Sequence, residues 1–159
     1  MSYIQIKNLS KSYSKVRALN KLNISIEQGD LFGVLGPNGS GKTTFLKILA
    51  TLIFPDDGEV YINKINVLKQ SREIRELIGY VAQEIALDKI LTGRELLDFQ
   101  ADLYHMKKSE KFKRIEFLIK ELDMSDWIDK KCGTYSGGMK RRIDLAAGLL
   151  HIPKVLILD

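Results

Sequence analysis

The sequence has 159 residues, about the length of one domain. Its 25 basic and 20 acidic side chains give a formal charge of +5, and 45% of its residues are hydrophobic, a balance typical of a soluble globular protein with a packed core. The basic side chains are scattered, so we expect no nucleic-acid partner. Cys132 is the only cysteine, which excludes an internal disulfide and favours a reducing compartment. No apolar run reaches the ~18 residues of a transmembrane helix.

The first half of the chain contains several segments whose apolar pattern predicts strands. Apolar and polar residues alternate in 3–7, 22–27 and 59–62, and a period of two with one apolar face predicts half-exposed antiparallel strands. Residues 31–35, LFGVL, are apolar throughout, which predicts a parallel strand buried on both faces. Residues 78–82, IGYVA, are intermediate between the two patterns.

A glycine-rich loop follows the LFGVL run directly. Its sequence GPNGSGKT matches G-x-x-x-x-G-K-[ST] between a predicted strand and a predicted helix. Glycine permits backbone angles that other residues avoid and lets successive amides converge on one anion, and the helix start adds the positive end of its dipole. A loop that merely turns the chain would not need three glycines around one lysine. The predicted nucleotide-binding residues are Gly36, Pro37, Asn38, Gly39, Ser40, Gly41, Lys42, Thr43 and Thr44.

The chemistry of three of these residues suits a nucleoside triphosphate with its metal. The ammonium of Lys42 would bridge the β- and γ-phosphates, and the hydroxyl of Thr43 would bind Mg²⁺. Thr44 would add an amide toward the α-phosphate. The loop is therefore interpreted as a phosphate cradle.

A helical segment begins at Thr92. Thr92-Gly93-Arg94-Glu95 fits a capping box, in which the Thr92 hydroxyl accepts from the amide of Glu95 and the Glu95 carboxylate reaches back. Apolar residues then recur at helical spacing as far as about residue 133. This pattern predicts an all-helical segment between two strand-rich parts.

The last quarter of the chain holds two further polar elements. YSGGMKRR, residues 135–142, places Ser136 and two glycines at the start of a predicted helix, where a hydroxyl, amides and the helix dipole suit an anion. Val155–Leu158 predicts a second buried parallel strand, and Asp159 follows it at the edge where open α/β sheets bind ligands. A carboxylate there can hold the water shell of Mg²⁺, although an aspartate that only ends a strand in a turn is common.

In this order, the loop, the YSGGM segment and the strand to Asp159 resemble the ATP-binding cassette (ABC) family, whose signature segment is commonly LSGGQ. The resemblance covers essentially the whole chain. It implies an α/β fold, a P-loop nucleoside-triphosphatase core with an antiparallel β subdomain and a helical insertion, incomplete at its C-terminus. We expect a P-loop and β-rich part over 1–91, a helical subdomain over 92–135, and the signature helix with the acidic strand over 136–159.

The resemblance also implies roles for individual residues. Tyr13 matches the aromatic residue that stacks on adenine, although a tyrosine packed at a strand end fits as well. Gln83 matches the glutamine that touches Mg²⁺ or the attacking water and senses the transmembrane partner, although it could simply be a polar residue that ends a strand. The implied catalytic residues are Lys42, Gln83 and Asp159, the implied metal ligands are Thr43, Gln83 and Asp159, and the implied contacts to ATP held by a second subunit are Ser136, Gly137 and Gly138.

The sequence departs from the family pattern in two ways. Tyr135 stands where leucine is usual and Met139 where glutamine is usual, a variant that resembles the branch serving drug- and polysaccharide-export permeases. The glutamate that the family places directly after Asp159, the later switch histidine, and a strand that inserts beside residues 31–35 are not in this sequence. We therefore expect these 159 residues to be part of a longer cassette, to fold poorly alone and not to hydrolyse ATP alone.

The function expected from the resemblance is that of an ATP-binding and ATP-hydrolysing subunit (an ATPase) of an ABC exporter, with ATP and Mg²⁺ as cofactors. It would pair with a second nucleotide-binding domain as a homo- or heterodimer. It would energise a separate transmembrane permease from the cytoplasmic, inner face of the cell membrane. Two alternatives stay open: a soluble ATPase of the same family acting in translation or DNA repair, and an inactive ATP-binding fragment.

Overall fold

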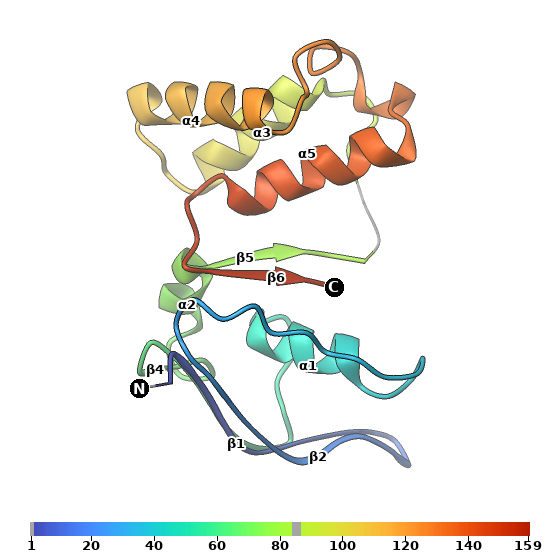
Figure 1. Cartoon of the computed structure of the whole chain (residues 1–159), viewed down its shortest axis with the longest axis vertical. Helices are drawn as coiled ribbons and strands as arrows, with labels where there is room; N and C mark the ends of the chain where they lie inside the picture. The colour runs from blue at the N-terminus through green and yellow to red at the C-terminus, as the bar shows by residue number, and fades with distance from the viewer. Residues whose placement is uncertain (1, 84–86) are drawn as a thin grey trace. The chain divides into compact units, whose positions relative to one another are not determined.

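The structure, a computed structural model, describes residues 2–83 and 87–159. The chain divides into two compact units, Met1–Leu77 and Ile78–Asp159, and each is described by itself. The first holds most of the strands and the glycine-rich loop, and the second holds three long helices and two strands (Figure 1). No helix of the described residues is long and apolar enough to cross a bilayer.

The first unit is built on a four-stranded antiparallel sheet. The strand order is β2-β1-β3-β4, and the register pairs Ile4 with Ile26 on one side and with Ile62 on the other. The three period-two segments lie in this sheet, so their prediction as antiparallel strands is confirmed. The strands are β1 (Ile4–Tyr13), β2 (Val16–Ile26), β3 (Asp57–Ile62) and β4 (Ile65–Asn66).

The core of this unit lies on one face of the sheet. Along β1 and β3 buried residues alternate with exposed or half-buried ones at the strand ends nearest Ile4 and Ile62, as a half-exposed sheet requires. Helix α1 (Lys42–Leu49) contacts β2 and contributes its own buried side chains. A short helix α2 (Ser71–Leu77), which the sequence pattern did not predict, adds the buried Ile74. The other buried side chains include Ile4, Ile6, Leu9, Phe45, Ile48, Val60 and Ile62.

The prediction of a buried parallel strand over 31–35 is wrong. The segment forms no ladder with any described strand, and Leu31 and Leu35 are 102% and 95% exposed. A strand needs a neighbour to take its backbone hydrogen bonds, and the strands of this unit pair only with one another among the described residues. The segment instead lines an open, largely apolar cavity of about 290 Å³ together with residues of β2 and α1.

The second unit combines a parallel strand pair with three helices. Strands β5 (Ile78–Val81) and β6 (Val155–Leu158) pair in parallel, with Ile78 opposite Val155, which confirms the parallel direction predicted for the second run. Burial on both faces is not observed, because Leu156 and Leu158 are exposed while Ile157 is buried. The helices are α3 (Gly93–Leu103), α4 (Lys108–Glu121) and α5 (Gly137–Leu149), with a 3₁₀ turn at Cys132–Thr134.

One hydrophobic core joins the three helices of the second unit. It contains Leu97 of α3, Leu118 of α4 and Ile143 of α5, each essentially inaccessible to solvent. Because these side chains share one core, the helical segment and the following helix lie in one compact unit. The division between compact units falls between residues 77 and 78, and the subdomain boundaries expected after residues 91 and 135 stay predictions.

Candidate functional site

The glycine-rich loop has a backbone that favours glycine at its end. Gly39 and Gly41 have φ of 82° and 90°, in the left-handed region that disfavours a side chain. A Cβ atom at Gly41 would also lie 2.3 Å from the carbonyl oxygen of Ala18. Gly41 is the N-cap of α1. The third glycine of the predicted motif is thus required by the fold of the loop itself.

The ammonium of Lys42 lies over the loop. Its Nζ donates to the carbonyl oxygens of Gly36 at 2.8 Å and Pro37 at 2.7 Å. An ammonium has three donors and no acceptor, so the anionic oxygens of a ligand could replace either carbonyl oxygen as a hydrogen-bond partner of Lys42. The lysine is therefore held at the mouth of the loop.

Helix α1 begins directly after this ammonium. Its first intrahelical bond runs from the Phe45 amide to the carbonyl oxygen of Gly41 at 2.9 Å, and its first turn contains no acidic residue. Thr43 and Thr44 follow Lys42 in this turn. A helix N-terminus without a carboxylate directs amides and the positive dipole end toward an anion, so the loop and α1 fit a polyphosphate.

Tyr13 lies at the end of β1 and is 49% exposed. Lys11 Nζ lies 5.6 Å from the ring centroid and forms an ion pair with Asp56 at 2.7 Å. The hydrogen bond from Lys11 lowers the pKa of Asp56. The exposed ring could accept a planar group on its face, as the prediction of adenine stacking requires.

In the second unit, helix α5 begins at Ser136. The Ser136 hydroxyl accepts from the Met139 amide at 3.3 Å, and the Met139 sulfur accepts from the Ser136 amide at 3.4 Å. Met139 therefore completes a capping box with its thioether, a contact that sequence reasoning missed. A Cβ atom at Gly137 or Gly138 would meet nothing within 4 Å, and neither has a positive φ. Crowding within the chain does not explain this glycine pair, whereas close approach of an outside group would.

Asp159 lies at the carboxyl end of β6 and contacts β5. Its amide donates to the carbonyl oxygen of Val81 at 3.0 Å, and its Oδ2 accepts from the Tyr80 hydroxyl at 2.9 Å. Burial and the contact with Asp159 raise the pKa of Tyr80 to about 12, so the phenol stays protonated and remains a donor at neutral pH. Tyr80 is a second residue at this edge that sequence reasoning missed.

Arg141 of α5 reaches the ends of both parallel strands. Its guanidinium donates to the carbonyl oxygen of Ala82 at 2.7 Å and lies 3.5 Å from that of Asp159. Ala82 directly precedes Gln83, whose side chain is exposed. Arg141 also lies 3.6 Å from Asp144, whose pKa is raised by burial. The helix that begins at Ser136 is thereby connected to the backbone beside Gln83 and Asp159.

The metal ligands predicted from the sequence lie on separate elements. Thr43 is in the first unit, whereas Gln83 and Asp159 are in the second. Among the described residues no three His, Cys, Asp or Glu side chains form a cluster that could hold a metal ion. A hydroxyl, an amide and a carboxylate supply the oxygen ligands that Mg²⁺ prefers, and the metal role of these three residues stays a prediction.

The chain matches the family model described as ABC transporter over residues 19–159. It is 39% identical over 156 residues to the daunorubicin resistance ATP-binding protein DrrA2 of Streptomyces coeruleorubidus, an alignment that covers 98% of this chain and 48% of that protein. It is 35% identical to the linearmycin resistance ATP-binding protein LnrL of Bacillus subtilis (strain 168), over 98% of this chain and 50% of the relative. The chain thus spans about half the length of these curated relatives.

Solved structures give the same result at the level of the fold. An ATP-binding subunit of an ABC transporter superposes with a TM-score of 0.88 at 25% identity, over 99% of this chain and 66% of that one. The dimeric bacterial ABC transporter cassette MJ0796 superposes with a TM-score of 0.87 at 30% identity, over 98% of this chain and 73% of that chain. A dimeric post-hydrolysis state of that cassette, bound to ADP and Pi, superposes with a TM-score of 0.85 at 30% identity, over 98% of this chain and 76% of that chain.

Proposed function

The chain belongs to the ABC transporter family, and from that premise we propose that it is the ATP-binding and ATP-hydrolysing part of an exporter. The observation that carries the proposal is the glycine-rich loop, where the Lys42 ammonium lies over the loop at the N-terminus of α1. Amides, a helix dipole and a fixed ammonium together suit the polyphosphate of ATP. The exposed ring of Tyr13 is assigned to adenine.

The residues that we assign to the nucleotide site have distinct chemical roles. Lys42 neutralises charge on the terminal phosphates and keeps them aligned for attack by water. Thr43 and Asp159 are assigned to Mg²⁺, which when bound would neutralise phosphate charge. Gln83 is assigned to the metal or to the attacking water. The Tyr80 hydroxyl orients the carboxylate of Asp159.

A second nucleotide-binding domain is the proposed partner for the start of α5. The glycine pair at 137–138 has open space above it, which supports contacts of Ser136, Gly137 and Gly138 with ATP held by that partner. The dimeric cassette among the similar structures supports the same arrangement. A separate transmembrane permease is the proposed source of membrane attachment, at the inner, cytoplasmic face.

The export role is supported by relatives whose names describe resistance to daunorubicin and linearmycin. The departures Tyr135 and Met139 agree with that branch. A soluble ATPase acting in translation or DNA repair would share the nucleotide chemistry, but no observation on this chain favours it. Co-purification of the intact protein with a membrane permease would support export, and co-purification with ribosomes or DNA would contradict it.

ATP binding is tested by thermal unfolding of the intact protein with and without ATP. A ligand that binds only the folded state raises the melting temperature, so we expect Lys42→Ala to abolish the rise seen in the wild type. Lys47→Ala is the matched control, because it removes the same charge from the last turn of the same helix. An equal ATP-dependent rise in the Lys42→Ala protein would refute the phosphate role of the loop.

A further inference from the structure

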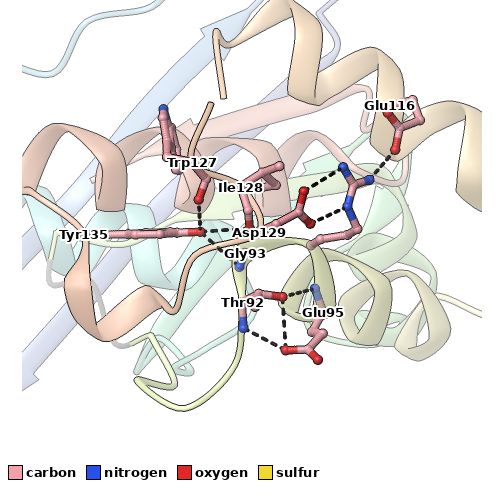
Figure 2. Close-up of polar contacts among 9 residues, drawn as sticks. Thr92, Gly93, Glu95, Glu116, Trp127, Ile128, Asp129 and Tyr135 are labelled. Carbon is pink, nitrogen blue, oxygen red and sulfur yellow. Dashed lines mark hydrogen bonds and ion pairs between the residues drawn. The ribbon is translucent and has the colours of Figure 1, made fainter. Parts of the chain in front are cut away.

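The unusual tyrosine at the start of the signature segment has a hydrogen-bonding role that leucine could not fill. Tyr135 is 5% exposed, and its hydroxyl accepts from the Gly93 amide at 3.0 Å. The same oxygen lies 3.1 Å from the carbonyl oxygen of Ile128 and 3.3 Å from that of Trp127 (Figure 2). One phenolic proton can serve one of these acceptors at a time. The Tyr135 hydroxyl is thus satisfied both as an acceptor and as a donor.

Gly93 and Tyr135 depend on each other. A Cβ atom at Gly93 would lie 2.5 Å from the Tyr135 hydroxyl oxygen, so only glycine leaves room for this contact. Gly93 is the first residue of α3, and its amide is one of the first-turn donors that a helix cannot satisfy internally. The Thr92 hydroxyl oxygen accepts from the Glu95 amide nitrogen of the same turn at 3.2 Å. Tyr135 therefore supplies α3 with a second cap from a distant part of the chain.

The next residue of α3 extends this contact. The Arg94 amide donates to the carbonyl oxygen of Ile128 at 3.2 Å, the same oxygen that Tyr135 approaches. The Arg94 guanidinium bonds to Asp129 at 2.7 Å and also to Glu116 of α4 (Figure 2). We call these connected residues the α3 joint, namely Gly93, Arg94, Ile128, Asp129 and Tyr135. The joint fixes Tyr135 against two helices and the segment between α4 and the 3₁₀ turn.

The α3 joint ends where α5 begins. Tyr135 is followed directly by Ser136, the N-cap of α5. The ring of Tyr135 is also held edge-on by Trp127, with 4.9 Å between ring centroids and 82° between ring planes. No side chain crowds Gly137 or Gly138, so this helix end is held by contacts on either side of the glycine pair, at Tyr135 before it and at Arg141 after it. Tyr135 is the nearest buried anchor on the N-terminal side.

We propose that Tyr135 is a positioning residue, whose hydroxyl holds the N-terminal end of α5 where Ser136, Gly137 and Gly138 meet the nucleotide of a second subunit. The inference rests on the proposed function, because it concerns the dimer that ATP closes. Tyrosine, in place of the usual leucine, would then connect α3 rigidly to the helix end that contacts the partner's ATP.

The test compares Tyr135→Phe with Tyr104→Phe in the intact protein. Both changes remove one hydroxyl from the same compact unit, and the Tyr104 ring instead stacks on His151 at 4.0 Å. Affinity for a fluorescent ATP analogue is measured on the monomer, and dimerisation is measured by analytical ultracentrifugation with a non-hydrolysable ATP analogue. We expect Tyr135→Phe to weaken dimerisation about fivefold, because a helix end that is less ordered in the monomer must be ordered on association, with monomer affinity unchanged within about twofold.

The outcomes separate this inference from the proposed function. Dimerisation of the Tyr135→Phe protein equal to that of Tyr104→Phe would overturn the positioning role while ATP binding stands. A wild-type protein that binds the analogue and stays monomeric would also overturn it. Absence of analogue binding in the wild type would instead overturn the proposed function. Each measurement is made well below the melting temperature of each variant, so that a lower stability alone does not change the dimer constant.

A second variant checks the α3 joint itself. Gly93→Ala introduces a Cβ that would lie 2.5 Å from the Tyr135 hydroxyl oxygen and 2.8 Å from Cδ1 of Ile128, and only the contact with Ile128 remains in the Tyr135→Phe background. We therefore expect Gly93→Ala to lower the melting temperature less in the Phe background than in the wild type, since contacting residues give non-additive effects. Equal losses in both backgrounds would show that the two residues do not contact each other as described.

Discussion

The Tyr80 hydroxyl donates to Oδ2 of Asp159 across 2.9 Å and joins two parallel strands at their carboxyl ends. Burial is the main reason that the pKa of Tyr80 rises to about 12, and the hydrogen bond to Asp159 adds to it. The tyrosine is therefore a permanent donor at neutral pH, and it restricts the rotation of the carboxylate assigned to Mg²⁺. One oxygen of that carboxylate already has a protein partner.

Replacement of Tyr80 by phenylalanine removes this donor and keeps the ring. We expect the free energy of unfolding to fall by about 1 kcal/mol, the typical contribution of one hydrogen bond, somewhat more because the acceptor is charged. Urea denaturation of the wild type and the Tyr80→Phe protein measures the difference. Equal denaturation midpoints would mean that the hydrogen bond from the Tyr80 hydroxyl to Asp159 does not stabilise the fold.

Arg141 and Arg142 are adjacent on α5 but donate to different parts of the second unit. Arg141 bonds to the carbonyl oxygen of Ala82, next to Gln83, whereas Arg142 contacts the carbonyl oxygens of Leu122 and Asp123. We expect Arg141→Ala to lower kcat of ATP hydrolysis about tenfold with little change in KM, because it disturbs groups that act on the reacting phosphate. Arg142→Ala should leave kcat within about twofold. Steady-state kinetics of the two variants in the intact protein decide this, and equal losses would contradict the assignment.

Two glycines of the loop should respond differently to alanine. A Cβ at Gly41 would collide with the carbonyl oxygen of Ala18, whereas a Cβ at Gly39 would meet nothing within 4 Å, although φ is positive at both. Backbone strain alone should make Gly39→Ala cost about 1–2 kcal/mol. Gly41→Ala should cost about 2–5 kcal/mol, because overpacking adds to the strain. Chemical denaturation measures both values, and the reverse order would show that the loop has another backbone.

His151 should make stability fall on acidification. Its Nε2 lies 2.9 Å from the carbonyl oxygen of Ile78, its ring stacks on Tyr104, and its buried Nδ1 has no partner among the described residues. Burial lowers the pKa of His151 below its ordinary value of 6.5. As the pH falls, His151 of the unfolded chain binds a proton before His151 of the folded chain does. The contribution of neutral His151 to the free energy of unfolding is therefore complete above pH 6.5 and declines as the pH falls toward the lowered pKa.

The measurement is the free energy of unfolding as a function of pH in the wild type and in His151→Phe. The variant keeps an aromatic ring against Tyr104 but cannot titrate, so its stability should depend less on pH below neutrality. His105→Asn is the control, because His105 is exposed and has φ of 53°, which asparagine tolerates. The control should keep the wild-type dependence of stability on pH. If the stability of the His151→Phe protein depended on pH as in the wild type, titration of His151 would be excluded as the cause.

Local features of the fold could be predicted because they depend on residues close in the chain. The capping box between Thr92 and Glu95 is formed as the spacing predicts. The alternating segments form the antiparallel sheet, and the glycine-rich loop leads into α1 at Lys42. The segment 31–35 shows where this reasoning fails, because an apolar run predicts a strand only if a neighbour supplies its hydrogen bonds.

The amino-acid sequence by itself determined the family, the glycine-rich loop and the polar residues that the function requires. Only the tertiary structure decided which distant groups support them. Tyr135 bonds to a residue 42 positions away, Arg141 to one 59 away and Tyr80 to one 79 away. Such contacts leave no periodic trace in the sequence, because they are set by how packed elements bring their surfaces together and not by residue spacing.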